Sequence, residues 1–138
     1  MNFASWNIRG ANRPFKQSEV RSLVSRHKVS LVALNETRVH EANHQVIIKA
    51  MLLGWKFITN YSEHPNGRIW VMWDQTTADI QPYLITDQLI HVRVTVIQLQ
   101  RTFEISFIYG HNTYTQRRDL WHPLRPYPTQ CKAGPGQC

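Results

Sequence analysis

The first third of the chain shows the apolar spacing of a strand–helix–strand–helix unit. Residues 1–6 form a short apolar run that predicts a strand, and apolar residues recur at helical spacing over residues 12–27. The run over residues 29–34 is nearly continuously apolar, which is typical of a strand buried on both faces. A second helix is expected over residues 41–53, because Gly54 directly after it favours a helix end.

The pattern then changes to short β-type runs rich in Val, Ile, Thr and aromatic residues. These runs cover residues 55–62, 68–74, 79–85, 89–99 and 102–110. Turn residues such as Pro65-Asn66-Gly67 separate them, and strands joined by such short turns are expected to be antiparallel. A final helix is expected over residues 113–124.

The chain has the length of a single domain, since two independent cores are unusual in 138 residues. Residues 1–124 are expected to form one α/β domain of mostly antiparallel strands. Residues 125–138 contain prolines and glycines but no apolar periodicity, so we expect a disordered tail there.

The charge balance changes this picture by suggesting a partner. Sixteen Lys and Arg residues against nine Asp and Glu residues give a net charge of +7, which favours polyanions, nucleic acid first. A protein that is merely basic is the alternative. No run is apolar enough to span a membrane and no signal peptide is visible, so an intracellular location is expected, in nucleus or cytoplasm. The oligomeric state is left open.

Polar residues interrupt the apolar runs at the predicted strand ends. Asn7 follows the first strand, Glu36 follows the second, and Tyr109 ends the last, with Asn112 three residues further on. In layered α/β folds binding groups gather at strand ends, so these side chains are expected to share one rim. A carboxylate there suits Mg²⁺, which takes one or two protein carboxylates and completes its shell with water and phosphate.

The same residues allow a purely structural interpretation. Glu36 would form an ordinary rim ion pair with Arg38, and Asn7 would cap a turn. From the residues alone, both interpretations stay open.

Five motifs, read in order, carry a family resemblance. They are "SWNIRG", "LNETRV", "GRIWVMWD", "FIYGHN" and "RRDLW". Over about residues 2–124 the chain resembles the N-terminal half of the endonuclease/exonuclease/phosphatase superfamily. Within it, the chain is most similar to the apurinic-type endonuclease domain of plant LINE (non-LTR) retrotransposons.

The resemblance implies a fold, an activity and a site. The fold would be a sandwich of two β-sheets flanked by helices, with about its N-terminal half present. The activity would be nicking of DNA with Mg²⁺ (or Mn²⁺). Glu36 falls on the family's metal ligand, Asn7 on an asparagine of the active-site network, Tyr109 on the active-site tyrosine and Asn112 on a nearby asparagine. Asn35 replaces the glutamine that precedes the metal ligand in the family.

Two further motifs of the family do not occur in the 138 residues. One is an Asp-x-Asn, which orients the attacking water, and the other is a Ser-Asp-His, whose histidine takes part in cleavage. We therefore expect this chain to be a truncated endonuclease domain that is inactive by itself. The alternative is a basic nucleic-acid-binding remnant without chemistry.

Two shorter features suggest other functions, and each has a commoner explanation. His40, Glu41 and His44 fit the zinc-protease pattern H-E-x-x-H, but three fixed positions match easily by chance, and a solvated first helical turn is expected instead. Trp70 and Trp73 resemble a base-stacking platform, yet aromatic residues in strands usually pack in a core.

Overall fold

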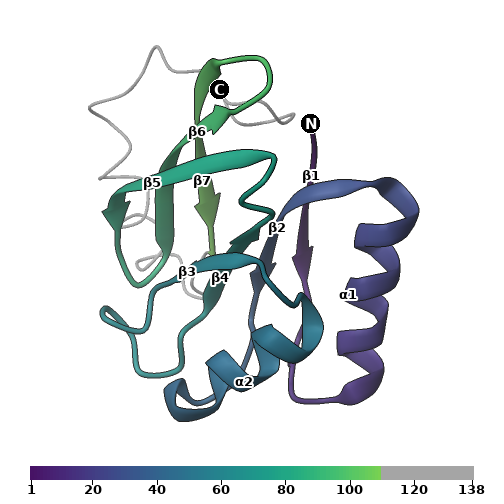
Figure 1. The fold of residues 1–138 in the computed structure, drawn as a ribbon. Coiled ribbons are helices and arrows are strands. Elements are labelled where there is room, and N and C mark those ends of the chain that lie inside the picture. Colours follow the sequence, from purple (N-terminus) through teal and green to yellow (C-terminus); the bar gives the residue numbers. More distant parts are fainter. Residues whose placement is uncertain (110–138) are drawn as a thin grey trace.

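The computed structural model describes residues 1–109 as two helices and seven strands (Figure 1). These are β1 (Asn2–Asn7), α1 (Pro14–His27), β2 (Val29–Asn35), α2 (Glu41–Met51), β3 (Lys56–Thr59), β4 (Ile69–Trp73), β5 (Ala78–Ile85), β6 (Leu89–Val96) and β7 (Arg101–Ile108). Each corresponds to an element predicted from the sequence. The helix predicted over residues 113–124 and the tail at 125–138 lie outside the described residues.

The strands form two sheets. Sheet A has the order β1-β2-β4-β3, and sheet B has the order β5-β6-β7. β1 and β2 are parallel, because α1 returns the chain to the starting end of the sheet. The other paired strands are antiparallel, as predicted. The expected α/β architecture of two packed sheets with helices is confirmed.

Sheet A lies between the two helices and sheet B (Figure 1). Successive side chains of a strand point to opposite faces, so each strand of sheet A can contribute to two clusters. Val32 and Leu34 of β2 pack with the helices, whereas Leu31 and Ala33 pack with sheet B. This explains the nearly continuous apolar run of β2.

The two tryptophans of β4 belong to the packed interior. Trp70 is fully buried in the cluster beneath the helices, and Trp73 is buried in the cluster between the sheets. The expectation of core packing rather than base stacking is thus confirmed for both. Neither α1 nor α2, the helices within residues 1–109, has the length and apolarity needed to cross a bilayer.

The topology brings several chain segments to one edge of the sandwich. β1 and β2 end there because they are parallel, and β4 begins there because Ile69 pairs with Asn35. β7 of sheet B ends nearby, since Asn35 Nδ2 donates to Ile108 O at 3.4 Å. The strand ends singled out by the sequence therefore meet at a common rim.

Candidate active site

Backbone hydrogen bonds continue past the ends of β1 and β2. Ile8 N donates to Asn35 O at 3.0 Å, and Gly10 N donates to Glu36 O at 2.8 Å. On its other side, Glu36 N donates to Arg68 O at 2.8 Å. The main chain of Glu36 is therefore fixed between the loop after β1 and the residue before β4.

Glu36 has a backbone conformation that is uncommon for a residue with a side chain. Its φ is 54°, and Arg38 lies in the same left-handed region with a φ of 55°. Such conformations cost about 1–3 kcal/mol each and gather at functional sites. Hydrogen bonds on both sides of Glu36 enforce this one, together with the 2.6 Å bond from Thr37 Oγ1 to Gly67 O. The chain thus departs from the strand conformation of β2 at the residue predicted to bind metal.

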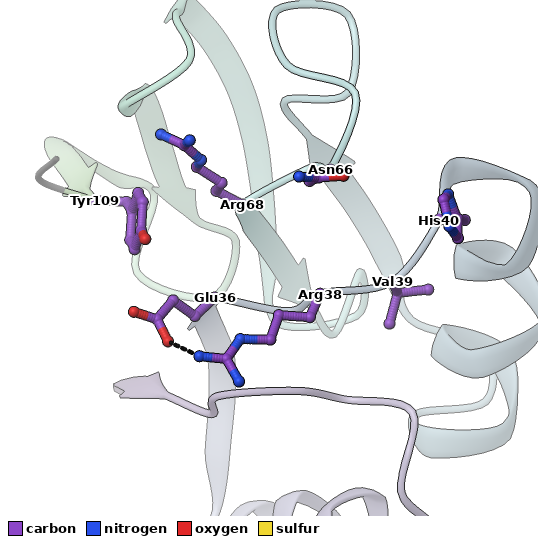
Figure 2. A pocket seen from close by; sticks show the side chains of 7 residues that line it. All are labelled: Glu36, Arg38, Val39, His40, Asn66, Arg68 and Tyr109. Atoms are coloured by element: carbon purple, nitrogen blue, oxygen red, sulfur yellow. Dashed lines mark hydrogen bonds and ion pairs between the residues drawn. The ribbon is translucent and has the colours of Figure 1, made fainter. Parts of the chain in front are cut away.

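A pocket of about 390 Å³ opens at this rim (Figure 2). It is lined by Glu36, Arg38, Val39, His40, Asn66, Arg68 and Tyr109. Tyr109 reaches it from the end of β7, where its N–H donates to Gln88 O at 2.7 Å. The structure therefore brings together two of the residues predicted from the sequence, Glu36 and Tyr109, from different sheets.

The two asparagines predicted for the site, Asn7 and Asn112, are not among the residues that line the pocket within residues 1–109. Asn7 is paired with Asn35 across β1 and β2, is exposed, and is not among the residues that line the pocket. Within residues 1–109 its side chain makes no hydrogen bond, so nothing described supports the turn-capping interpretation. Asn112 lies outside the described residues. The roles of all four residues stay predictions.

Glu36 and Arg38 form the ion pair that the structural interpretation anticipated. Arg38 Nη2 lies 3.1 Å from Glu36 Oε2, and the Arg38 side chain is 64% exposed (Figure 2). An ion pair with so exposed a partner contributes little, about 0–1 kcal/mol. A cation of higher charge could therefore compete with Arg38 for the carboxylate.

The side chains at this rim offer a divalent metal one carboxylate, that of Glu36. Within residues 1–109 no three His, Cys, Asp or Glu side chains gather closely enough to hold an ion. Mg²⁺ nevertheless binds through as few as one protein carboxylate when water and substrate phosphate fill the other positions. The Glu36 carboxylate, partly exposed at an open pocket, fits an ion held in that way.

Arg68 and Asn66 also line the pocket, although neither is among the site residues predicted from the sequence. Arg68 lies with its guanidinium carbon 5.2 Å from the centre of the Tyr109 ring. A signal for it existed: Arg68 directly precedes β4, and β4 is antiparallel to β2, so it must lie at the end where Glu36 is found. The contact with Tyr109 depends on how the sheets pack and has no local sequence signal.

Behind the pocket, Tyr61 connects its wall to the core. Tyr61 Oη donates to Val39 O at 2.7 Å and accepts from Trp70 Nε1 at 3.2 Å. Burial raises the pKa of the Tyr61 phenol above its ordinary value of 10.0. The neutral phenol is therefore the form that the folded protein prefers.

We expect Tyr61→Phe to lower the free energy of unfolding by about 1–2 kcal/mol at neutral pH, because Val39 O and Trp70 Nε1 lose their partner. Since the folded pKa is raised, the unfolded chain ionises first. The difference in free energy of unfolding between the wild type and Tyr61→Phe is therefore at its full value below pH 10.0. It falls as the pH rises through the pKa of Tyr61 in the folded protein. Urea unfolding of both proteins from neutral pH to about pH 11 tests this. A difference that stays constant over that range would contradict it.

The H-E-x-x-H pattern does not form the zinc-protease arrangement. His40 is the N-cap of α2, has an extended backbone and lies outside the helix. His44 is buried, its ring contacts those of Phe57 and Tyr61, and its Nδ1 bonds with Glu41 O. The expected solvated first turn is therefore wrong for His44, because aromatic residues of β3 and the following turn cover it.

Several solved structures are similar to this chain. The endonuclease domain of TRAS1, a telomere-specific non-LTR retrotransposon, is similar with a TM-score of 0.60 and 10% identity, over 86% of this chain and 52% of that domain. An endonuclease/exonuclease/phosphatase family protein from Bacteroides thetaiotaomicron gives 0.64 and 11%, over 90% and 58%. The AP endonuclease LMAP from Leishmania major gives 0.60 and 15%, over 91% and 44%. The chain has the endonuclease/exonuclease/phosphatase fold.

The chain spans about half the length of these endonuclease/exonuclease/phosphatase structures. No protein-family model matches the sequence, and neither does the sequence of any curated protein. At identities of 10–15% this likeness establishes the fold and not the chemistry.

Proposed function

We propose that the chain is the N-terminal part of a Mg²⁺- or Mn²⁺-dependent DNA endonuclease domain of the LINE retrotransposon type, as in plants. The observation that carries this proposal is the position of Glu36. Its carboxylate lies in a pocket shared with Tyr109 and with two arginines, at the common end of strands from both sheets. The likeness to the TRAS1 endonuclease domain and to an AP endonuclease supports it.

Each residue has a role in this proposal. Glu36 would hold the metal ion, which when bound acts as a Lewis acid on a phosphodiester oxygen. Asn7 and Tyr109 are neutral donors suited to phosphate oxygens, and Asn112 has that role by resemblance alone. The net charge of +7 attracts DNA to the surface, with an affinity that falls as salt is added.

The chemistry is incomplete within the 138 residues. Hydrolysis needs a group that activates the attacking water and a donor to the leaving oxygen. The Asp-x-Asn and Ser-Asp-His motifs that would provide them by resemblance do not occur in the sequence. We therefore propose that this chain by itself cleaves DNA little or not at all.

Plasmid nicking by the purified chain, with Mg²⁺ or with EDTA, tests this expectation. The expected result is no more nicking than in the EDTA control. Mg²⁺-dependent nicking that is lost in Glu36→Gln would show that the residues present suffice, and the proposed inactivity would be wrong.

Metal binding gives the proposal a positive test that needs no activity. Titration of Mn²⁺, followed by its electron paramagnetic resonance signal, is expected to show weak binding that is lost in Glu36→Gln. Asp79→Asn is the matched control, because Asp79 is an exposed carboxylate on β5, outside the pocket lining. Equal Mn²⁺ binding by wild type and Glu36→Gln would remove Glu36 as the metal ligand.

A second candidate is a nucleic-acid-binding protein without chemistry. The arginines around the pocket and the basic composition favour it. It predicts that DNA binding is the same in Mg²⁺ and in EDTA and is indifferent to Glu36→Gln. The metal-dependent proposal predicts that DNA binding strengthens with Mg²⁺ only while Glu36 is present.

A further inference from the structure

β1 lies at the edge of sheet A, and its outer side is open. Within residues 1–109 it pairs with β2 alone, in a register that is regular from Phe3 to Asn7 (Figure 1). None of the residues of β1 is buried, whereas most residues of β2 are. The Phe3 side chain is 36% exposed. The strand therefore carries apolar surface that a further strand could cover.

The other edge strands of the two described sheets carry features that discourage pairing with another chain. β3 has the exposed Lys56, and β5 has Pro82 with an irregular register at that residue. β7 has Arg101 and Glu104. Charged residues, proline and irregular pairing are the means by which proteins keep open edges from adding strands. β1 has neither a charged residue nor a proline, so it is the edge best suited to accept a strand.

The backbone groups of β1 alternate between β2 and the open side. Ile8 N, just past the strand, donates to Asn35 O at the end of β2. The N–H and C=O groups two and four residues before Ile8 therefore point toward β2 as well. Those of Phe3, Ser5 and Asn7 consequently point to the open side, where no strand within residues 1–109 pairs with them.

A second copy of β1 matches this row of open groups in an antiparallel arrangement. With Ser5 opposite Ser5 of the second copy, Phe3 lies opposite Asn7, and each such pair exchanges both of its hydrogen bonds. All the open groups of both strands are then used. On the helix side Trp6 lies opposite Ala4 of the second copy, so a large side chain meets a small one. The strand is self-complementary, as a two-fold interface requires.

A hollow beside β1 provides room for the tryptophan of the second copy. Its volume is about 530 Å³, and Ala4 lines it together with Leu23 and His27 of α1. Ala4 and Trp6 both pack against the core cluster beneath the helices, so they share one face of the strand. Since Trp6 of the second copy lies opposite Ala4, its indole would cover the hollow and remove apolar surface from water.

We infer that β1 is the docking surface for a second copy of this chain, whose β1 adds antiparallel to the first with Ser5 at the two-fold axis. Addition of a strand to an open sheet edge is an established mode of recognition. Chain length supports this occupant: the chain spans about half the length of the similar structures, so two copies supply as much polypeptide as one of them. The inference depends neither on the metal nor on cleavage.

Sedimentation equilibrium of the purified 138-residue chain over a series of concentrations tests the association. A monomer–dimer equilibrium without larger species is expected, because the pairing uses the open edges of both copies. The dissociation constant is expected to fall as salt is added, since two copies of net charge +7 repel each other and salt screens the repulsion. Association through contaminating DNA would instead weaken with salt. A chain that is monomeric at every concentration overturns the inference.

Opposite charges at Ser5 test the register of the two strands. Ser5→Lys and Ser5→Glu each place like charges opposite one another across the axis, and each is expected to raise the dissociation constant about fivefold. An equimolar mixture of the two variants is expected to dimerise at least as tightly as the wild type, because opposite charges then meet. Ser62→Lys and Ser62→Glu are the matched controls, since Ser62 is exposed in the turn after β3, at the other edge of sheet A.

Ser5→Pro removes the central N–H donor of the open edge and keeps the pairing with β2. It is expected to be monomeric at every concentration, with the circular dichroism spectrum of the wild type. Wild-type association of Ser5→Pro, or equal dissociation constants for the mixture and for the separate charge variants, would overturn the pairing through β1. If Ser5→Pro does not fold, the charge variants decide. None of these outcomes depends on Mn²⁺ binding at Glu36.

Discussion

Gly67→Ala is expected to lower the free energy of unfolding by about 3 kcal/mol, through a clash and a strained backbone. A Cβ added at Gly67 would lie 2.0 Å from Cε1 of Tyr61 and 2.3 Å from Cδ1 and Cζ. The backbone there has a φ of 48°, which a residue with a side chain adopts only at a cost. The Tyr61 ring cannot move away cheaply, because its hydroxyl bonds to both Val39 and Trp70.

A second glycine separates the two causes. Gly54 also has a positive φ, 82°, but a Cβ there would meet nothing within 4 Å. Gly54→Ala therefore reports the conformational cost alone, about 1 kcal/mol. Urea unfolding of the two variants gives the difference that belongs to the clash with Tyr61. Equal losses would mean that the ring adapts without cost.

The same substitution should also weaken DNA binding. Gly67 lies between Asn66 and Arg68, which line the pocket, and its carbonyl accepts the bond from Thr37 Oγ1. A shift of this turn would move Arg68 relative to Tyr109. We therefore expect Gly67→Ala, under conditions where it is folded, to bind a short DNA duplex more weakly than the wild type does.

Much of the fold followed from the sequence because local patterns determine it. The continuous apolar run of β2 predicted a strand with two buried faces, and the core clusters on either side of it are the reason. The short turns predicted antiparallel strands. Polar residues at strand ends pointed to the rim, since Glu36 and Tyr109 end strands that the topology brings to the same edge.

The remaining features depend on contacts between distant segments. The left-handed conformation of Glu36 results from hydrogen bonds to segments on both sides and has no residue signature, because glutamate rarely adopts it. The stacking of Arg68 on Tyr109 requires both sheets. The burial of His44 requires Phe57 and Tyr61, which follow it in the chain. Sequence periodicity cannot report such pairings.

Asn60→Ala is expected to lower the free energy of unfolding by about 3–4 kcal/mol. It tests how the two sheets are held together at the rim. Asn60 is fully buried, and its Nδ2 donates at 3.2 Å to the carbonyls of both Thr86 and Asp87. Its Oδ1 accepts from Ile69 N at 3.0 Å. Removal of the amide leaves a buried N–H without a partner, which costs more than the lost bonds themselves.

Asn66→Ala is the control for this loss, because Asn66 is an exposed asparagine of the same turn. In urea unfolding, the free energy of unfolding of Asn66→Ala is expected to lie within about 0.5 kcal/mol of the wild-type value. A similarly small loss in Asn60→Ala would show that the bonds across the sheets contribute little.

Asn60 also affects the candidate site through the turn between β5 and β6, whose carbonyls at Thr86 and Asp87 it binds. Gln88 adjoins the segment that Asn60 holds, and its carbonyl accepts the hydrogen bond from Tyr109 N at 2.7 Å. Asn60 of sheet A therefore fixes the backbone that positions Tyr109 beside Arg68. Folded Asn60→Ala should then bind a short DNA duplex more weakly than the wild type does. An unchanged DNA affinity in a destabilised protein would show that Tyr109 is positioned by other contacts.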